Sequence, residues 1–340
     1  MTVSSKQANA KRSLLSIIIP AYNVEDYILA AVESALRQTY ADIEVIVVED
    51  GSTDSTFEKL QTVTDRRVRI VQQKNRGLAG ARNTGILESS GEYIGLLDGD
   101  DIWYPEKGRA LVQELERDPR LGIAFSFAEY VDEKGEPTGQ LHITHKAEPT
   151  LEDVIVRNVI AHPVVRRECF SQAGLFDESL RQCEDYEMWV RVLSKTRYKC
   201  RLAPQVLYGY RVRSGSLMTN HREFMDNANR VMEIFQRSIP EFNAKLKNQA
   251  VAEFCRITAR RALSGGQIEL AWSLMRDVFR QCPWLVFRDV RAFGTCGLII
   301  LEKFLPNGLH HFPYKTARIL MKIFYRIYRS EILNPASSGK

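Results

Sequence analysis

Four short apolar runs, separated from one another by helix-like segments, constrain the fold of this chain more than any other feature of its sequence. The first, residues 14–19, is rich in β-branched side chains and ends at Pro20, and similar runs follow at residues 43–48, 68–71 and 93–97. Continuous apolar runs of this length are typical of strands buried on both faces of a parallel sheet. Because strands that alternate with helices favour right-handed β-α-β units, the first hundred residues predict an α/β fold with a mostly parallel sheet flanked by helices.

The segments between these runs have the periodicity of helices. From Val24 to Leu36 apolar residues recur in steps of three and four, which indicates an amphipathic helix with Asn23 as its N-cap. Further helices are expected near residues 57–63 and over residues 78–87. In a sheet of this kind ligands bind beyond the carboxyl ends of the strands, so acidic residues at those ends are the first candidates for chemistry.

The texture of the sequence changes near Asn220, beyond which strand-like runs disappear and helical periodicity dominates. A length of 340 residues suits two domains. We therefore expect a polar N-terminal tail over residues 1–13, an α/β domain that carries the candidate site over residues 14–220, and a helical extension over residues 221–340.

Positive charge is concentrated near the C-terminus. The net charge is +5, yet residues 284–330 contain eight Lys or Arg against two acids, so the remainder is close to neutral. This distribution argues against nucleic acid as a partner, which would need a basic surface along the whole domain. Between Tyr314 and Arg329 the basic residues recur in steps of three and four without an acid. That pattern favours a helix at an anionic membrane surface, with docking on the protein's own core as the alternative.

The sequence predicts no export. Six cysteines are scattered without metal-like spacing, as expected of reduced cytoplasmic thiols. The first thirteen residues lack the apolar core of a signal peptide, and the longest uncharged apolar stretch, residues 292–301, is too short to span a bilayer. We expect a cytoplasmic protein, peripheral on the inner membrane face if the basic helix binds lipid.

Acidic residues stand at or near the ends of the predicted strands. Glu49 and Asp50 close the second strand, residues 98–101 (DGDD) close the fourth, and Glu184 and Asp185 precede a later helix-like segment. Carboxylates are costly to bury unpaired, so several on one sheet edge need a cation or hydrogen-bond donors. Carboxylates two residues apart suit Mg²⁺ or Mn²⁺ shared with a diphosphate, whereas a polar turn is the alternative.

Six segments in order resemble the glycosyltransferases of family 2 over about residues 14 to 215. They are residues 16–23 (SIIIPAYN), 47–54 (VVEDGSTD), 75–85 (NRGLAGARNTG), 93–101 (YIGLLDGDD), 174–178 (GLFDE) and 184–189 (EDYEMW). The resemblance implies the A-type, Rossmann-like nucleotide-sugar fold. It also implies inversion at the anomeric carbon by a single in-line displacement.

The resemblance assigns the nucleotide-sugar donor to residues at the ends of the first, second and fourth strands. It implies that a nucleotide pocket is lined by the consecutive residues Pro20, Ala21 and Tyr22. It implies that Asp50 accepts a hydrogen bond from the base. Donor contacts are also expected from Arg82, Asp98 and Gly99.

The same resemblance assigns the chemistry to three carboxylates. Asp98 and Asp100 would bind a divalent cation, Mn²⁺ or Mg²⁺, that bridges to the diphosphate. Asp185 would act as the general base on the acceptor hydroxyl, which is a poor nucleophile until a carboxylate takes its proton. A cation and basic side chains would stabilise the charge that grows on the leaving nucleoside diphosphate.

Each of these residues also has a structural interpretation. Asp50 suits an Asx turn before Gly51. Arg82 suits a surface charge or an ion pair at the sheet edge, and Asp185 suits the cap of the helix that follows it. Trp103 is expected to pack in the core rather than to stack on an acceptor sugar.

One position departs from the family pattern. Many relatives have a histidine a few residues after a Tyr-Arg pair in a late loop, where this chain has Arg213. Arginine keeps its positive charge, so neutralisation of the diphosphate is expected there rather than metal ligation.

The resemblance further suggests a glycan or lipid-linked acceptor, in the assembly of a surface polysaccharide or glycolipid. A dinucleotide-dependent oxidoreductase would share the β-α-β pattern, but residues 20–23 (PAYN) replace its glycine-rich phosphate turn. The remaining alternative is an inactive transferase fold that acts as a scaffold through its helical tail.

Overall fold

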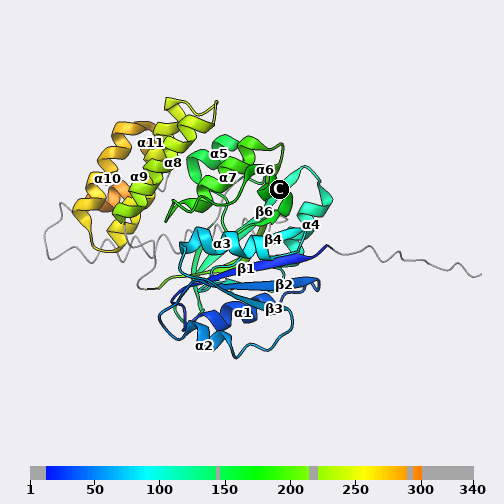
Figure 1. Cartoon of the computed structure of the whole chain (residues 1–340). Coiled ribbons are helices and arrows are strands. Elements are labelled where there is room, and N and C mark those ends of the chain that lie inside the picture. Colours follow the sequence, from blue (N-terminus) through cyan, green and yellow to red (C-terminus); the bar gives the residue numbers. More distant parts are fainter. Residues whose placement is uncertain (1–12, 143–145, 214–220, 289–293, 301–340) are drawn as a thin grey trace, which may run out of the picture.

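The protein is built around one twisted sheet, with helices on both faces and a cluster of helices at one side (Figure 1). A computed structural model describes residues 13–142, 146–213, 221–288 and 294–300. Within these ranges the sheet has nine strands, in the order β3-β2-β1-β4-β8-β6-β9-β5, with β7 paired to β6. The strands are β1 (Leu15–Ala21), β2 (Ile43–Glu49), β3 (Val68–Gln72), β4 (Tyr93–Leu96), β5 (Ile102–Trp103), β6 (Leu121–Val131), β7 (Pro137–His142), β8 (Val164–Arg166) and β9 (Lys199–Arg211).

The first four strands form the parallel half of the sheet. β1 pairs in parallel with both β2 and β4, and β2 pairs in parallel with β3. All seven residues of β1 and all four of β4 are buried, as expected for strands covered on both faces. The parallel β-α-β arrangement predicted for the first hundred residues is confirmed.

The other half of the sheet changes direction at β8, which runs antiparallel to both of its neighbours, β4 and β6. β6 therefore runs in the same direction as β4, and so does β9, which is parallel to β6. β5 and β7 add antiparallel pairs at β9 and β6. Consequently the start of β8 and the ends of β4 and β9 lie at the same edge of the sheet, which is called the carboxyl edge below.

Helices cover both faces of the sheet. They are α1 (Ile28–Leu36), α2 (Thr56–Leu60), α3 (Gly77–Glu88), α4 (Lys107–Arg117), α5 (Leu151–Arg157), α6 (Arg167–Ala173) and α7 (Glu184–Lys195). Because side chains alternate along a strand, Ile17 and Ile19 of β1 share a core with α1 and α4. Ile18 points the other way, into a core with α3, α5, α6 and α7.

The helical extension follows the last strand. Its helices are α8 (His221–Ser238), α9 (Ala244–Ser264), α10 (Ile268–Gln281) and α11 (Pro283–Arg288). Tyr186 of α7 packs between Phe235 of α8 and Phe254 of α9, with both ring-centroid distances 5.2 Å. One apolar core thus extends across residue 220, and the division into separate domains at that point stays a prediction.

Two sequence-based details of packing have opposite outcomes. Trp103 is buried as predicted, and a Cβ added at Gly95 would lie 2.3 Å from its ring, so β4 needs glycine there. The cap predicted for α1 is wrong, because the helix begins at Ile28 and Tyr27 is its N-cap residue. Asn23 instead has a positive φ of 51° and accepts a hydrogen bond from the Thr53 amide at 2.8 Å, which ties β1 to the loop after β2.

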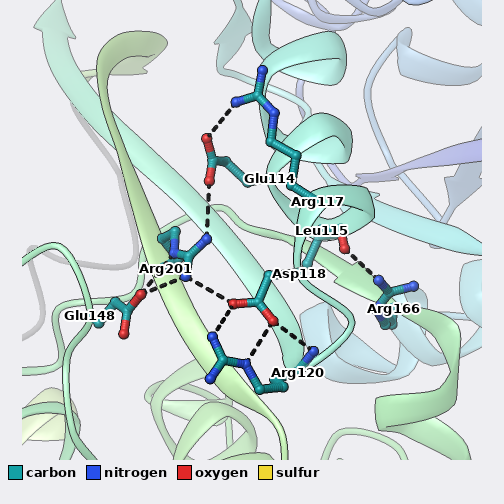
Figure 2. A network of polar contacts seen from close by, with 8 residues as sticks. All are labelled: Glu114, Leu115, Arg117, Asp118, Arg120, Glu148, Arg166 and Arg201. Carbon is teal, nitrogen blue, oxygen red and sulfur yellow. Dashed lines mark hydrogen bonds and ion pairs between the residues drawn. The ribbon is translucent and has the colours of Figure 1, made fainter.

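The edge opposite the carboxyl edge is closed by ion pairs (Figure 2). Arg201, near the start of β9, contacts Asp118 at 2.9 Å, Glu148 at 2.5 Å and Glu114 at 3.6 Å. Asp118, just before β6, also accepts hydrogen bonds from the Arg120 side chain at 2.8 and 2.9 Å. Every carboxylate of this network is matched by a guanidinium.

Two predicted segments lie outside the described residues: most of the N-terminal tail and the basic segment between Tyr314 and Arg329. Among the helices that the structure does describe, none combines the length and the apolar character needed to cross a bilayer.

Candidate active site

The candidate site lies at the carboxyl edge of the sheet, where ligands bind in open α/β sheets. Asp50 follows β2, and Asp98 to Asp101 follow β4. Because β8 runs in the opposite direction, His162 enters the same edge from just before β8. The end of β1, Arg82 of α3, the end of β9 and the first turn of α7 also contribute residues to the site.

Asp50 is buried and holds the loop that leads into α3. Its Oδ1 accepts hydrogen bonds from Gln73 Nε2 at 2.6 Å and from the Arg76 amide at 2.9 Å. The Asx turn considered for Asp50 is wrong, because the Ser52 amide donates to Glu49 Oε1 at 2.6 Å instead. The expected contact of Asp50 with the base of the donor remains a prediction.

The end of β1 passes very close to the loop that carries Asp98. Pro20 and Ala21 are buried, whereas Tyr22 is 46% exposed and its ring is accessible to a ligand. A Cβ at Gly99 would lie only 2.8 Å from the Pro20 carbonyl oxygen. Gly99 is therefore required for packing between β1 and this loop, whatever it contributes to donor binding.

Arg82 of α3 is a buried guanidinium held between two carboxylates. Its Nη1 donates to Glu184 Oε1 at 2.6 Å, and its Nη2 donates to Asp98 Oδ1 at 2.8 Å. Burial acts to lower the pKa of Arg82, but the charges of Asp98 and Glu184 outweigh it and raise the pKa. Of the two structural interpretations, the ion pair is observed and the surface charge is excluded. Within the described part of the chain, the buried Nε of Arg82 has no hydrogen-bond partner.

Asp98, Asp101 and His162 form the group of described residues that could hold a metal ion together. One potential ligand atom from each lies within 4.8 Å of the other two. Asp101 adjoins the predicted pair, but no sequence pattern distinguished it, and His162 was missed altogether. His162 has a positive φ of 45°, and its ring stacks on Tyr208 with centroids 3.8 Å apart. Its unusual backbone and this stacking together place the imidazole beside Asp98.

Burial and neighbouring charges shift the pKa values of Asp98, Asp101 and His162 in different directions. Burial alone would raise the pKa of Asp98, but the charge of Arg82 lowers it. Burial and the neighbouring charges of Asp100 and Asp98 raise the pKa of Asp101, although its carboxylate accepts bonds from the Tyr208 hydroxyl and the Arg211 amide, both at 2.7 Å. Burial lowers the pKa of His162 to about 3, so its imidazole is neutral at physiological pH.

Asp100, the other predicted cation ligand, is not a member of this group. Its Oδ2 accepts a hydrogen bond from Arg213 Nε at 2.6 Å, and its backbone oxygen accepts one from Arg211 Nε at 2.6 Å. Arg213 thus contacts the acidic loop of residues 98–101, and its positive charge was expected from the sequence to neutralise the diphosphate. The role of Asp100 as a metal ligand stays a prediction.

Glu184 and Asp185 begin α7, and their environments differ. Glu184 is paired with Arg82, yet burial raises its pKa to about 7. Asp185 makes no ion pair with any described residue, and its Oδ1 accepts a hydrogen bond from the Tyr186 amide at 2.7 Å. Burial raises its pKa as well. The helix-cap alternative is wrong, since the N-cap residue is Cys183, with φ of 63°, and Asp185 lies inside the first turn.

Comparison with solved structures identifies the fold as that of the A-type glycosyltransferases. The mannosyltransferase PcManGT from Pyrobaculum calidifontis, solved with GDP-Man and Mn²⁺, matches 95% of this chain and 88% of its own, with a TM-score of 0.59 and 16% identity. S. aureus TarS 1-349, in complex with UDP-GlcNAc, matches 85% of this chain and 91% of its own, with a TM-score of 0.57 and 16% identity. At such identities the likeness concerns the fold alone.

Sequence comparison gives the family. A family model with the description Glycosyl transferase family 2 matches residues 16–181 of this chain. The UDP-Glc:alpha-D-GlcNAc-diphosphoundecaprenol beta-1,3-glucosyltransferase WfaP of Escherichia coli is 34% identical over 215 residues, 61% of this chain and 80% of that protein. The chain belongs to glycosyl transferase family 2. It spans only 30% of an uncharacterized glycosyltransferase of Rickettsia felis, which is 34% identical over 185 residues and 53% of this chain.

Proposed function

We propose that this protein transfers a sugar from a nucleoside-diphosphate donor to an acceptor hydroxyl, with inversion at the anomeric carbon and with the aid of a divalent cation. The proposal rests on the division of labour between the two acids that begin α7. Glu184 is occupied by Arg82, whereas Asp185 is half-buried and has no cationic partner among the described residues. A carboxylate that is positioned but not neutralised can take a proton from an acceptor hydroxyl.

Asp185 is thus the general base. As its carboxylate takes the proton, the acceptor oxygen attacks the anomeric carbon from the face opposite the departing diphosphate, which inverts the configuration. This resembles the logic of an inverting glycosidase, with the acceptor hydroxyl in place of water. The ion pair with Arg82 keeps Glu184 charged or hydrogen-bonded beside Asp185. Glu184 therefore does not compete with Asp185 for the acceptor proton.

The leaving diphosphate is assigned to the other side of the site. Asp98, Asp101 and His162 fit a divalent cation, because the set combines two hard oxygen donors with a neutral imidazole. An imidazole in the set favours Mn²⁺ over Mg²⁺, and the cation would stabilise negative charge on the leaving group. Asp100 lies next to this set and is the further candidate ligand. Arg213 and the unpartnered Nε of Arg82 are the proposed protein contacts of the diphosphate.

The nucleoside is assigned to the end of β1 and to the loop after β2. Tyr22 offers an exposed ring beside Pro20 and Ala21, and Asp50 has one carboxylate oxygen without a bond to a described residue. Loss of a buried acceptor for the base is expected to cost about 1–3 kcal/mol. Asp50→Ala should therefore weaken nucleoside diphosphate binding by that amount in calorimetry, and unchanged affinity would remove Asp50 from the pocket.

A glycan or lipid-linked acceptor, as in surface polysaccharide or glycolipid assembly, is proposed from the relatives. The printed name of WfaP specifies an acceptor sugar on a diphosphoundecaprenol, and another relative is the chondroitin synthase of Escherichia coli. We also propose that the protein acts at the cytoplasmic membrane face through the basic segment between Tyr314 and Arg329. Binding to anionic liposomes that falls as salt rises would support this contact, and its absence in the full-length protein would refute it.

The test of the proposed function is a donor panel. UDP-, GDP- and other nucleotide sugars are incubated with the protein, Mn²⁺ or Mg²⁺, and candidate sugar acceptors, and proton NMR follows the anomeric configuration of the product. The proposal requires metal-dependent turnover of at least one donor and a product of inverted configuration. Retention of configuration, or full activity in EDTA, would contradict the mechanism.

A further inference from the structure

Arg261 of α9 is a guanidinium for which the proposed mechanism has no use. Its side chain lies over the ring of Phe224, with the guanidinium carbon 5.1 Å from the ring centroid. Among the residues that the structure describes, its buried Nη1 has no hydrogen-bond partner and no carboxylate forms an ion pair with Arg261. A buried donor without a partner costs free energy, and a buried charge without an anion costs more. Such an arrangement is expected where the anion arrives with a ligand.

The guanidinium of Arg261 lies on the side of α9 that faces the α/β part of the chain. Phe254 lies seven residues earlier, on the same face of α9, and packs against Tyr186 of α7. Arg261 is close enough to Tyr210, Tyr130 and Cys183 to interact with them electrostatically. Cys183 immediately precedes the Glu184–Asp185 pair. Arg261 is therefore on the side of the site where the proposed base is found.

Aromatic rings connect this guanidinium to the cation group. The ring centroid of Tyr210 is 5.6 Å from that of Tyr130 and 5.8 Å from that of His162. Among the described residues the Tyr210 hydroxyl has no hydrogen-bond partner, so it is a second donor available near Arg261. A guanidinium and a phenol hydroxyl within electrostatic range of each other can both donate hydrogen bonds to a group with several anionic oxygens.

We propose that Arg261, with the Tyr210 hydroxyl, binds an oxyanion carried by the acceptor substrate, a phosphate or a carboxylate. The inference rests on the proposed function, because it places the acceptor beside Asp185. The donor diphosphate is assigned to the other side of Tyr210, near Asp98 and Arg213. An acceptor held through its anionic group on α9 would present a hydroxyl to Asp185, which gives the helical extension a role in acceptor selection.

Stability provides the first test, and it needs no substrate. A guanidinium that waits for a ligand contributes little to the fold, so Arg261→Met should leave the thermal midpoint unchanged or raise it. The matched control is Arg256→Met on the same helix. Arg256 is buried and paired with Glu253 at 2.7 Å, so its removal should lower the midpoint clearly. An equal fall in both variants would make Arg261 a structural residue and overturn the proposal.

Binding provides the second test and separates the two sources of the oxyanion. Full-length protein in EDTA, which keeps cations from recruiting the probe, is titrated with phenyl phosphate or with benzoate by ligand-observed NMR. Wild-type protein should bind at least one probe, and Arg261→Gln should weaken that binding about ten- to a hundredfold. Arg260→Gln removes the same charge from the adjacent position and should leave the affinity unchanged. Equal binding by wild type and Arg261→Gln, or binding of neither probe, would overturn the proposal.

Donor affinity distinguishes this inference from the proposed function. UDP and GDP are titrated in the presence of Mn²⁺ into wild type and Arg261→Gln. Equal nucleotide affinity supports assignment of Arg261 to the acceptor, whereas a parallel loss would assign it to the donor and refute the inference. If the donor panel showed no turnover at all, the proposed transferase function would fail, while the probe titrations would still report whether Arg261 binds an anion.

Discussion

Both edges of the sheet bring arginines and carboxylates together, but with opposite results. At the edge where β6 and β9 begin, Asp118 is matched by two arginines (Figure 2). Hydrogen bonds from the Arg120 side chain and backbone, together with positive charge, lower the pKa of Asp118. At the carboxyl edge Asp98 and Glu184 share the buried guanidinium of Arg82, and burial raises the pKa of Asp101, Glu184 and Asp185.

We interpret the ion pairs where β6 and β9 begin as stabilising the fold, and the carboxylates at the carboxyl edge as serving the proposed reaction. Asp118 is buried, but its partner Arg120 and the Arg201 partner Glu148 are exposed, and ion pairs that remain in contact with water contribute modestly to stability. Buried carboxylates that outnumber their cationic partners lower the stability of the fold. Such carboxylates are expected at sites where they bind a ligand or exchange protons. Groups whose environments push their pKa values apart are the ones to which acid and base roles are assigned. The lowered pKa of Asp98 suits the cation site proposed for it, and the raised pKa of Asp185 suits its proposed role as the proton acceptor.

The largest expected effect is the difference in stability between variants of the two central arginines, Arg82 at the carboxyl edge and Arg201 at the opposite edge. Arg82→Met would leave Asp98 and Glu184 without their shared guanidinium in a buried site, which is expected to cost about 3–5 kcal/mol. Arg201→Met at the opposite edge breaks more contacts by number, but Arg201 and two of its partners, Glu114 and Glu148, are partly exposed to water, so its cost should be smaller. Urea unfolding of both variants makes the comparison, and a larger loss for Arg201→Met would reverse it.

Cation binding should depend on one edge only. His162→Gln is expected to weaken Mn²⁺ binding at least about tenfold, because loss of a ligand should cost no less than loss of an outer-shell partner. Mg²⁺ binding should fall less, since Mg²⁺ prefers oxygen ligands. Glu148→Gln, at the opposite edge, should change neither affinity. The two ions are titrated by calorimetry, and unaltered Mn²⁺ affinity in His162→Gln would exclude the imidazole from the site.

The smallest effect is on the dependence of stability on pH. The folded-state pKa of Glu184 is raised from 4.5 to about 7, so its contribution to stability is fully present below pH 4.5 and is lost as pH rises toward 7. The pKa of Asp118 is lowered, so its contribution is present above its ordinary pKa of 3.8 and is lost in acid. Glu184→Gln should therefore flatten the unfolding free energy between pH 4.5 and 7, and Asp118→Asn should alter only the acid range. Identical pH profiles for Glu184→Gln and wild type would contradict this assignment.

Much of the carboxyl edge could be predicted from the sequence because parallel strands buried on both faces have a clear apolar signature. The runs that became β1, β2 and β4 fixed where Asp50 and Asp98 would lie, since each follows a strand end. The resemblance to family 2 then distinguished these residues from ordinary turn residues.

The rest of the site depended on contacts that no periodicity reports. β8 has only three residues and runs antiparallel, so the sequence did not indicate that His162 enters the edge beside Asp98. Within residues 98–101 the pattern could not show that Asp101 turns inward while Asp100 turns to Arg213. Asn23 has the composition of a helix cap, yet a tertiary hydrogen bond to the loop after β2 decides its conformation.

The most direct test of the account compares the same substitution at the two edges. Asp185→Asn and Asp118→Asn each replace one carboxylate by a nearly isosteric amide, and single-turnover transfer is measured on folded samples of both. Loss of the general base should slow transfer by Asp185→Asn about 10²- to 10⁴-fold, with donor affinity and thermal midpoint close to wild type. Asp118→Asn should transfer at the wild-type rate and lose thermal stability. Near-normal transfer by Asp185→Asn would contradict the central claim and move the search for the base to Glu184.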